Sequence, residues 1–150
     1  MNILRSLAAV LLLAAAASSA SAADKNYTRG SVWLVSMIQV EPGKGDDYID
    51  SLKQEYTTVY EEAIKQKVIL SYKILEGDAA NPNDWDVMIE TEVANFAAID
   101  GLEAKFDAIA EKILGSQAKA DETDKQAMAA RAAIRKIFGE KVMQEIHYTK

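Results

Sequence analysis

Apolar and polar positions alternate along this chain in a way that predicts four strands. Residues 31–40 form a nearly continuous apolar run, which is typical of a central strand covered on both faces. Residues 70–76 and 85–92 alternate between apolar and polar side chains, as half-buried strands do, and they are close enough to pair as a hairpin with a long loop. Residues 142–148 alternate in the same way and are expected to form the last strand.

Three further stretches have the spacing of three and four residues that predicts helices. Residues 46–67 carry one apolar stripe after two aspartates that suit the first turn of a helix. Residues 95–115 are expected to form a second helix, capped by Asn95 and ended by Gly115. A third helix is expected at 123–138, because Thr123 and Gln126 form a capping-box signature.

The order of these elements predicts an α+β fold. Strand, helix, strand, strand, helix, strand is the ferredoxin-like βαββαβ arrangement, here with one extra helix before the last strand. In that arrangement a four-stranded antiparallel sheet carries its helices on one face. The other face is then left for solvent, a ligand or a second copy of the chain.

The same stretches resemble the dimeric α/β-barrel superfamily. The resemblance rests on residues 32–43 (VWLVSMIQVEPG), on 81–89 (NPNDWDVMI) and on the long helical segment before a short last strand. It implies a homodimer that pairs sheet against sheet. Residues 81–115 also look like a segment of small exported bacterial proteins without an assigned activity. The superfamily includes haem-degrading and cofactor-free monooxygenases, isomerases and stress proteins, so the fold selects no activity.

The first 22 residues have the pattern of a signal peptide. Arg5 precedes an apolar stretch at 7–17, and 20–22 (ASA) fits a cleavage site. The apolar stretch is shorter than the ~20 residues that span a bilayer, which favours cleavage over a permanent anchor. We therefore expect a periplasmic or secreted protein without membrane attachment. Its expected parts are the signal peptide at 1–22, a flexible mature N-terminus at 23–30 and one domain at 31–150.

Composition excludes several classes of function. The chain has no cysteine, so thiol chemistry, iron–sulfur clusters and cysteine-based zinc sites are excluded, and a single histidine makes a zinc site of the ordinary type untenable. The formal charge of −6 becomes −7 when Arg5 is lost with the leader. A chain this acidic has no general attraction for nucleic acid or anionic lipid. We expect no metal and no cofactor, with haem as the alternative.

The candidate residues for chemistry lie on the predicted strands. His147 is the only histidine, and Glu145 lies two residues away on the same strand face, where it could orient the imidazole. Glu90 could act as a base if apolar neighbours raised its pKa. The simpler interpretation is that both His147 and Glu90 are partly solvated strand residues.

A ligand site is the other possibility for these strands. Trp33, Tyr72 and Met88, together with Glu145, could line a cleft for a flat apolar or aromatic molecule. The simpler interpretation of the aromatic residues is ordinary core packing.

The expected third helix carries a group of basic side chains. Arg131 and Arg135 would lie one turn apart, with Lys136 beside them, and such a group could bind an anion. In an acidic protein we favour a solvated helix face with exposed ion pairs.

Three functions fit these observations. We favour an exported, non-catalytic binding or interaction domain that dimerises through its sheet and takes a small apolar or aromatic ligand or a protein partner. The second is an enzyme of the cofactor-free or haem-using monooxygenase type, with His147, Glu90 and Trp33 in its cavity. The third is a structural or stress-response homodimer without a ligand.

Overall fold

The computed structural model describes residues 26–149, which form a four-stranded sheet with helices on one side. The strands are β1 (Tyr27–Val40), β2 (Ser71–Glu76), β3 (Val87–Val93) and β4 (Arg135–Tyr148), in the order β2-β3-β1-β4. Every neighbouring pair is antiparallel. This order and direction are those of the ferredoxin-like fold, so the predicted fold class is confirmed. The predicted signal peptide lies outside the described residues.

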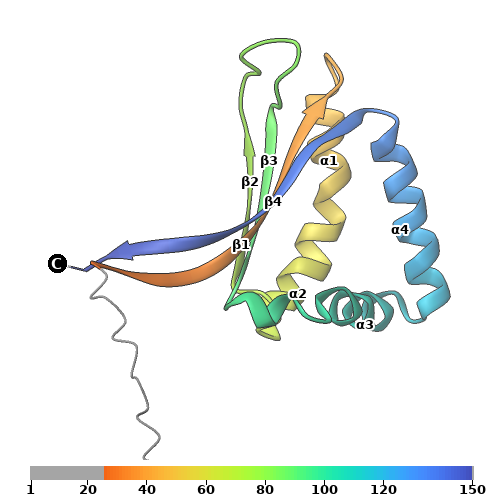
Figure 1. Ribbon diagram of the computed structural model, residues 1–150. Helices are drawn as coiled ribbons and strands as arrows, with labels where there is room; N and C mark the ends of the chain where they lie inside the picture. Colours follow the sequence, from red (N-terminus) through yellow and green to blue (C-terminus); the bar gives the residue numbers. More distant parts are fainter. Residues whose placement is uncertain (1–25, 150) are drawn as a thin grey trace, which may run out of the picture.

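The helices all lie on the same side of the sheet (Figure 1). The first helical segment consists of α1 (Gly45–Glu55), a π-helical turn (Tyr56–Tyr60) and α2 (Glu61–Lys65). After β3, a 3₁₀ turn (Phe96–Ile99) leads into α3 (Leu102–Leu114), and α4 (Gln117–Ala132) then leads to β4. In Figure 1, α1 follows the sheet, α3 crosses near α2, and α4 returns toward the start of β4 at a greater distance from the sheet.

The two faces of the sheet follow from strict alternation along β3. Val87, Ile89, Thr91 and Val93 are buried, whereas the residues between them are half-buried. We call the side that carries the helices the helix face and the other side the open face. Cross-strand partners share a face, so the register assigns the neighbouring strands too: Ile38 joins Val87 on the helix face, and Met37 joins Met88 on the open face.

The core lies between the helix face and the first helical segment. One buried cluster joins Ile38, Val40, Tyr48, Leu52, Tyr56, Val87 and Ile89. A second joins Val32, Ala63, Ile69, Val93 and Ile109, which ties α3 to the other end of the sheet. The predicted apolar stripe of the first helix therefore packs as expected. Helix α4 contributes little to either cluster, since only Ala120 and Arg131 are buried along it.

The long strands β1 and β4 differ from the prediction at both ends. Residues 27–30 belong to β1, and 27–29 pair with the end of β4, so the flexible segment expected at 23–30 is wrong for residues 27–30. Tyr27 faces Tyr148 and Thr28 faces His147. Pairing between distant segments organises residues that have no apolar pattern of their own. The result is a two-stranded arm that projects from the body of the domain (Figure 1).

The third helix begins and ends earlier than predicted. Ser116 caps α4 by accepting a hydrogen bond from the Lys119 amide (3.4 Å), in place of the expected capping box at Thr123. The helix ends at Ala132, and residues 135–138, expected to be helical, form the start of β4. Arg135 faces Val40 and Ile137 faces Ile38, so the last turns of the predicted helix instead complete the pairing of β1.

The second predicted helix is also divided. Asn95 is an N-cap as expected, but its side chain accepts from the Ala98 amide and caps the short 3₁₀ turn. Gly101 has a φ of +66°, a left-handed conformation that interrupts the helical path, and α3 begins at Leu102. Gly115 ends α3 as predicted, with a φ of +87°.

Candidate functional site

The principal cavity lies between the helix face of the sheet and the helices, not on the open face. It has a volume of about 530 Å³. Its walls come from β1, α1, the π-helical turn, β3, the end of α4 and the first half of β4. The side chains that line it include Leu34, Tyr48, Tyr56, Tyr60, Thr91, Met128, Arg131, Arg135, Ile137, Glu140 and Val142. This hollow lies beneath the helix layer, whereas the sequence led us to expect a cleft on the open face.

Three tyrosines form the inner wall of this cavity. Tyr48 and Tyr56 are buried, and the rings of Tyr56 and Tyr60 stack with centroids 4.1 Å apart. Tyr60 hydrogen-bonds to Tyr56 and to Thr91 on β3. Burial raises the pKa of all three phenols above the ordinary value, so they remain neutral at physiological pH. The wall therefore offers flat apolar rings and neutral hydroxyl groups.

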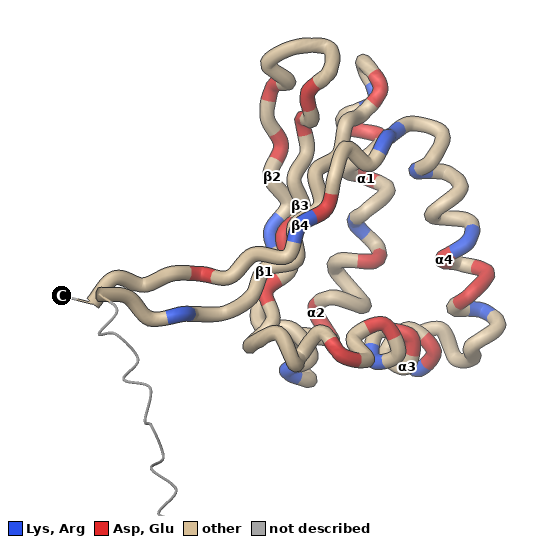
Figure 2. The backbone as a smooth tube through the Cα atoms, in the orientation of Figure 1, with Lys and Arg blue, Asp and Glu red and all other residues tan. Residues whose placement is uncertain are grey.

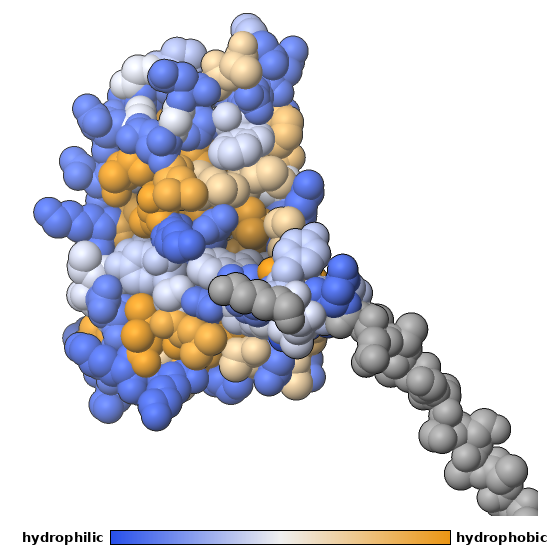
Figure 3. Space-filling view, turned by 90° about the vertical axis from the view of Figure 1, so that its left-hand side faces the viewer, coloured by the Kyte–Doolittle hydropathy of each residue, from blue (hydrophilic) through white to orange (hydrophobic). Residues whose placement is uncertain are grey.

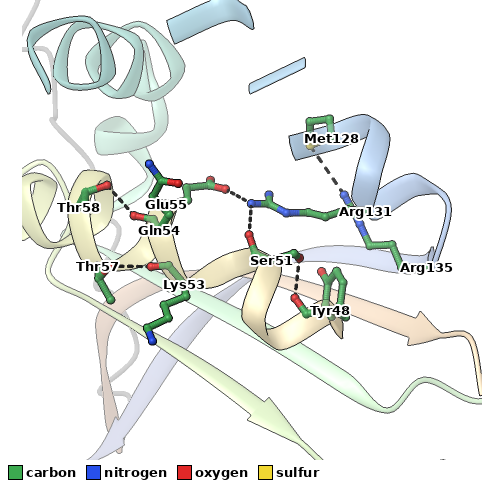
Figure 4. A network of polar contacts seen from close by, with 10 residues as sticks. All are labelled: Tyr48, Ser51, Lys53, Gln54, Glu55, Thr57, Thr58, Met128, Arg131 and Arg135. Carbon is green, nitrogen blue, oxygen red and sulfur yellow. Dashed lines mark hydrogen bonds and ion pairs between the residues drawn. The ribbon is translucent and has the colours of Figure 1, made fainter. Parts of the chain in front are cut away.

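The π-helical turn places two of these rings. It spans Tyr56–Tyr60 and widens the helix by one residue between α1 and α2. Thr57 and Thr58 in this turn donate their hydroxyls to the carbonyls of Lys53 and Gln54, at 2.7 and 2.6 Å (Figure 4). Such insertions occur frequently at functional sites, and this one lies directly against the cavity.

Arg131 crosses from α4 to α1 at the border of the cavity. The residue is only 5% exposed, and its Nη2 donates to Glu55 Oε2 at 2.7 Å and to the Ser51 carbonyl at 3.1 Å (Figure 4). It also borders a second, smaller cavity of about 260 Å³ between α1, α3 and α4. The Arg131–Glu55 pair is therefore a bridge between helices that separates two hollows.

Arg135 approaches the same cavity from the first residue of β4. Its guanidinium lies 5.8 Å from the centre of the Tyr48 ring, and its Nη2 lies 3.9 Å from Met128 Sδ. Among residues 26–149 it forms no ion pair. The Nε–H groups of Arg131 and Arg135 are both buried without an acceptor among these residues. The solvated helix face that we favoured for this group is therefore wrong for Arg131, which is buried, although the expected ion pair exists with Glu55. Arg135 is half-buried and belongs to β4, not to a helix.

The outer rim of the cavity is apolar and poorly covered. Met128 on α4 is 44% exposed, and Ile137 and Val142 on β4 are 48% and 51% exposed. All three line the cavity. Because α4 stands away from this half of the sheet, large apolar side chains that would normally be core are left partly in water (Figure 1).

Most of the predicted site residues lie on the open face. Trp33 faces Met143 on β4, and Lys73 Nζ lies 4.5 Å from the centre of its indole ring. Glu90 Oε2 lies 3.8 Å from the same lysine nitrogen. Met88 faces Met37 on β1. These residues form a shallow mixed surface, and the space-filling view from this side shows apolar areas bordered by polar side chains (Figure 3).

His147 and Glu145 lie on the projecting arm, away from the other candidates. His147 Nε2 is 3.3 Å from Glu145 Oε2, so the expected orienting contact exists, but the histidine side chain is 55% exposed. Val35 on β1 pairs with Glu90 of β3 on one side and with Lys141 of β4 on the other. His147 lies six residues beyond Lys141 along β4. Six strand residues span about 20 Å. The sheet therefore does not bring His147 and Glu90 into one catalytic centre.

Tyr72 lies on the other face from Trp33 and Met88. Its ring centroid is 5.1 Å from that of Tyr56 and 5.6 Å from that of Tyr60, and its hydroxyl donates to Glu61 at 3.1 Å. It therefore supports the tyrosine wall from behind. The expected grouping of Tyr72 with the open-face residues is wrong. Tyr72 on β2 pairs with Thr91 on β3, and Thr91 lies on the helix face.

Two signals in the sequence point to the cavity that the residue-by-residue interpretation missed. Tyr56 and Tyr60 are separated by four residues, which places two aromatic rings on one helical face. Helix α4 has few large apolar residues, so it cannot close the sheet tightly. Neither signal fixes the distance between α4 and the sheet, which decides whether a hollow forms.

The part of the chain that the structure describes offers no cluster of three or more histidine, aspartate or glutamate residues able to hold a metal ion. Within residues 26–149, no helix is both long and apolar enough to cross a membrane.

Comparison with known proteins finds a similar solved structure but does not assign the chain to a family. No family model matches the chain, and no curated protein matches it. A solved structure of a protein from an uncultured marine organism, described as a dimeric ferredoxin-like protein, resembles it at 10% identity and a TM-score of 0.44. The likeness covers 81% of this chain and 96% of the other. The fold assignment itself rests on the strand order and register described above.

Proposed function

We propose that this domain binds a small apolar or aromatic molecule in the cavity between its sheet and its helices, without catalysing a reaction. The observation that carries the proposal is the size and lining of that hollow. A volume of about 530 Å³ falls within the roughly 300–1,000 Å³ of small-molecule sites. Such sites combine apolar and aromatic walls with a few polar groups, as this one does.

The exposed rim supports an occupant. Met128, Ile137 and Val142 each leave about half of their surface in water. Covering apolar surface contributes about 25 cal/mol per Å². A ligand that fills the space between α4 and β4 would cover these side chains without any change in the fold.

The chemistry of the lining favours binding over catalysis. The buried phenols have raised pKa values and are poor acids and bases near neutral pH. Glu55 is paired with Arg131, and the single histidine lies on the arm. A haem-using or cofactor-free enzyme centred on His147, Glu90 and Trp33 has no support from this arrangement, because these residues do not share a cavity.

A neutral polarity-sensitive dye tests the proposal. Nile red is expected to fluoresce strongly with the purified protein. Ile137→Trp, which places a large ring at the cavity rim, should weaken this signal roughly tenfold. Leu70→Trp is the matched control, since Leu70 is 46% exposed, as against 48% for Ile137, and lines neither cavity. Equal binding by both variants, or no binding by the wild type, would reject the cavity as a ligand site.

The proposal includes pairing of two copies through the open face. Leu75 and Met143 are 46% and 53% exposed on this side, and lysines and glutamates are interspersed among them. A two-fold arrangement can bring opposite charges together around such apolar patches. Light scattering should give twice the mass of the mature chain, and Met143→Glu should reduce it to one. Val142→Glu, one residue away on the other face, should remain dimeric; a monomeric wild type would contradict the pairing.

Export to the periplasm is the remaining part of the proposal. Its support is the pattern of residues 1–22, with an apolar stretch followed by a small-residue cleavage site. Expression of the full chain in a bacterial host and N-terminal sequencing of the periplasmic product should give Ala23 as the first residue. Retention of Met1 in the cytoplasmic fraction would contradict export. If the dimer forms but no dye binds, the structural homodimer becomes the better account.

A further inference from the structure

The cavity joins an aromatic wall to two arginines whose hydrogen-bonding capacity is incompletely used. We propose that its ligand is an acid: the carboxylate lies between Arg131 and Arg135, and the apolar or aromatic body lies against the tyrosines and the rim. This inference rests on the proposed function, because it names the chemical class of the molecule in the same cavity.

The first argument is the state of the two guanidinium groups. Arg131 is 5% exposed, and a buried Nε–H without an acceptor is found on both arginines. A buried donor without a partner is costly, and native structures rarely keep one without a reason. Two such donors on one cavity wall indicate a place where an acceptor belongs.

The second argument is charge. Arg131 is neutralised by Glu55 Oε2 at 2.7 Å, whereas Arg135 has no carboxylate partner within residues 26–149. Glu140 also lines the cavity, but it is exposed and its carboxylate accepts from Ser36 Oγ at 3.5 Å. Basic positions gather where α4 ends and β4 begins (Figure 2). The uncompensated positive charge is therefore local to this wall of an otherwise acidic protein.

The third argument is that the fold itself does not use Arg135 as an anchor. Its contacts are a thioether sulfur and the face of Tyr48, which place the guanidinium at the cavity but do not neutralise it. The C-terminal end of α4 favours nearby positive charge through the helix dipole. That effect holds a cation in place but supplies no oxygen to the buried Nε–H. An arginine prefers a carboxylate, which can accept two parallel hydrogen bonds.

A matched pair of ligands tests the inference. 3-Phenylpropionate and its neutral amide, 3-phenylpropionamide, have nearly the same shape and differ in charge. Each is titrated against the protein in complex with Nile red. With the wild type, the carboxylate is expected to displace the dye at a roughly tenfold lower concentration than the amide.

Variants locate the effect. Arg135→Gln removes one charge at the cavity and should abolish the preference for the carboxylate. Acid and amide are compared within the same variant, so a change in its affinity for Nile red does not affect the comparison. Lys136→Gln removes the same charge from the next residue, which is exposed and does not line the cavity, and the preference should persist. Arg135→Lys keeps the positive charge but loses the planar guanidinium group, so part of the preference for the carboxylate should remain.

The outcomes separate this inference from the proposed function. The acid is overturned if acid and amide displace the dye equally, or if neither displaces it. The binding site itself stands in either case, provided that Nile red binds the wild type and Ile137→Trp weakens that binding. A preference for the carboxylate that survives Arg135→Gln also overturns the assignment. Failure of Nile red itself to bind removes the proposed function, and the acid with it.

Discussion

The two faces of this sheet differ in a way that the order of elements does not reveal. The helix face is covered by α1, α3 and α4, yet a cavity of about 530 Å³ lies between it and the helices. The open face carries no helix, yet Val35 at its centre is only 6% exposed. A sheet face can thus be covered by helices while the space beneath them is not filled by side chains. A binding site needs such unfilled space.

The first prediction compares neighbouring residues on one strand. Ile38 points into the core at 2% exposure, and Met37 points to the open face. Ile38→Ala should lower the free energy of unfolding by about 2–5 kcal/mol. Met37→Ala should cost about 1 kcal/mol or less at low protein concentration. Urea unfolding followed by circular dichroism measures both, and similar losses would show that the open face is packed as tightly as the core.

The second prediction concerns the bridge beside the cavity. Arg131→Met removes the partner of Glu55 and two hydrogen bonds, and should cost about 2 kcal/mol, less than for a fully buried pair because the Glu55 side chain is 35% exposed. Adding Glu55→Gln should restore about 1 kcal/mol, since no carboxylate is then left without its cation. Denaturant unfolding of the two single variants and the double variant gives the coupling. Additive losses would mean that the bridge does not join α4 to α1 energetically.

The fold could be predicted from sequence because local patterns and tertiary pairing agree over most of the chain. Strand β3 alternates in the sequence as it does in burial, and the split βαβ order then fixes the faces. The pattern fails at residues 135–138, where a helical period continues past Ala132 but pairing with β1 prevails. It fails at 27–30 for the same reason, since only β4 organises that segment as a strand.

The candidate site was less predictable, because it depends on a distance. The sequence places His147, Glu145 and Met143 on one strand face, and the register confirms that Met143 shares its face with Trp33. The sequence does not show that β4 continues beyond the body of the domain. This extension of β4 separates His147 from Glu90. Arg131 and Arg135 were visible as a basic pair, but their burial results from where α4 stands, and no local pattern encodes that position.

The third prediction concerns the arm on the open side. A Cβ added at Gly30 would overlap His147 Nε2 and lie 2.9 Å from Glu145 Oε2. Gly30→Ala should therefore displace the imidazole and break its contact with Glu145, at a cost of about 1 kcal/mol or less because both side chains can rotate into water. Amide hydrogen exchange in 144–148 should become faster.

His147→Ala alone should change the stability by less than about 0.5 kcal/mol, as for other exposed residues. In the Gly30→Ala background it should return exchange in the arm to the wild-type rate, because the displaced ring is gone. Continued fast exchange in the double variant would show that Gly30 is needed for its backbone in the bulge between Arg29 and Val32, and not for the space it leaves.

The smallest effect is expected from a carboxylate on the open face. Hydrogen bonds from Ser31 and Ser71 lower the pKa of Glu92 below its usual value, and the Ser71 contact is 2.6 Å long. A lowered pKa in the folded state means that Glu92 stabilises the protein above the unfolded pKa near 4.5, and that this contribution is lost as the pH falls through the lower folded value. Glu92→Gln should therefore cost a few tenths of a kcal/mol at pH 7, since partly exposed carboxylates contribute little. Unfolding in urea at pH 7 and pH 3 should show the difference from wild type shrinking at the lower pH. A difference that grew on acidification would mean that the protonated carboxyl, and not the carboxylate, is the form this face stabilises.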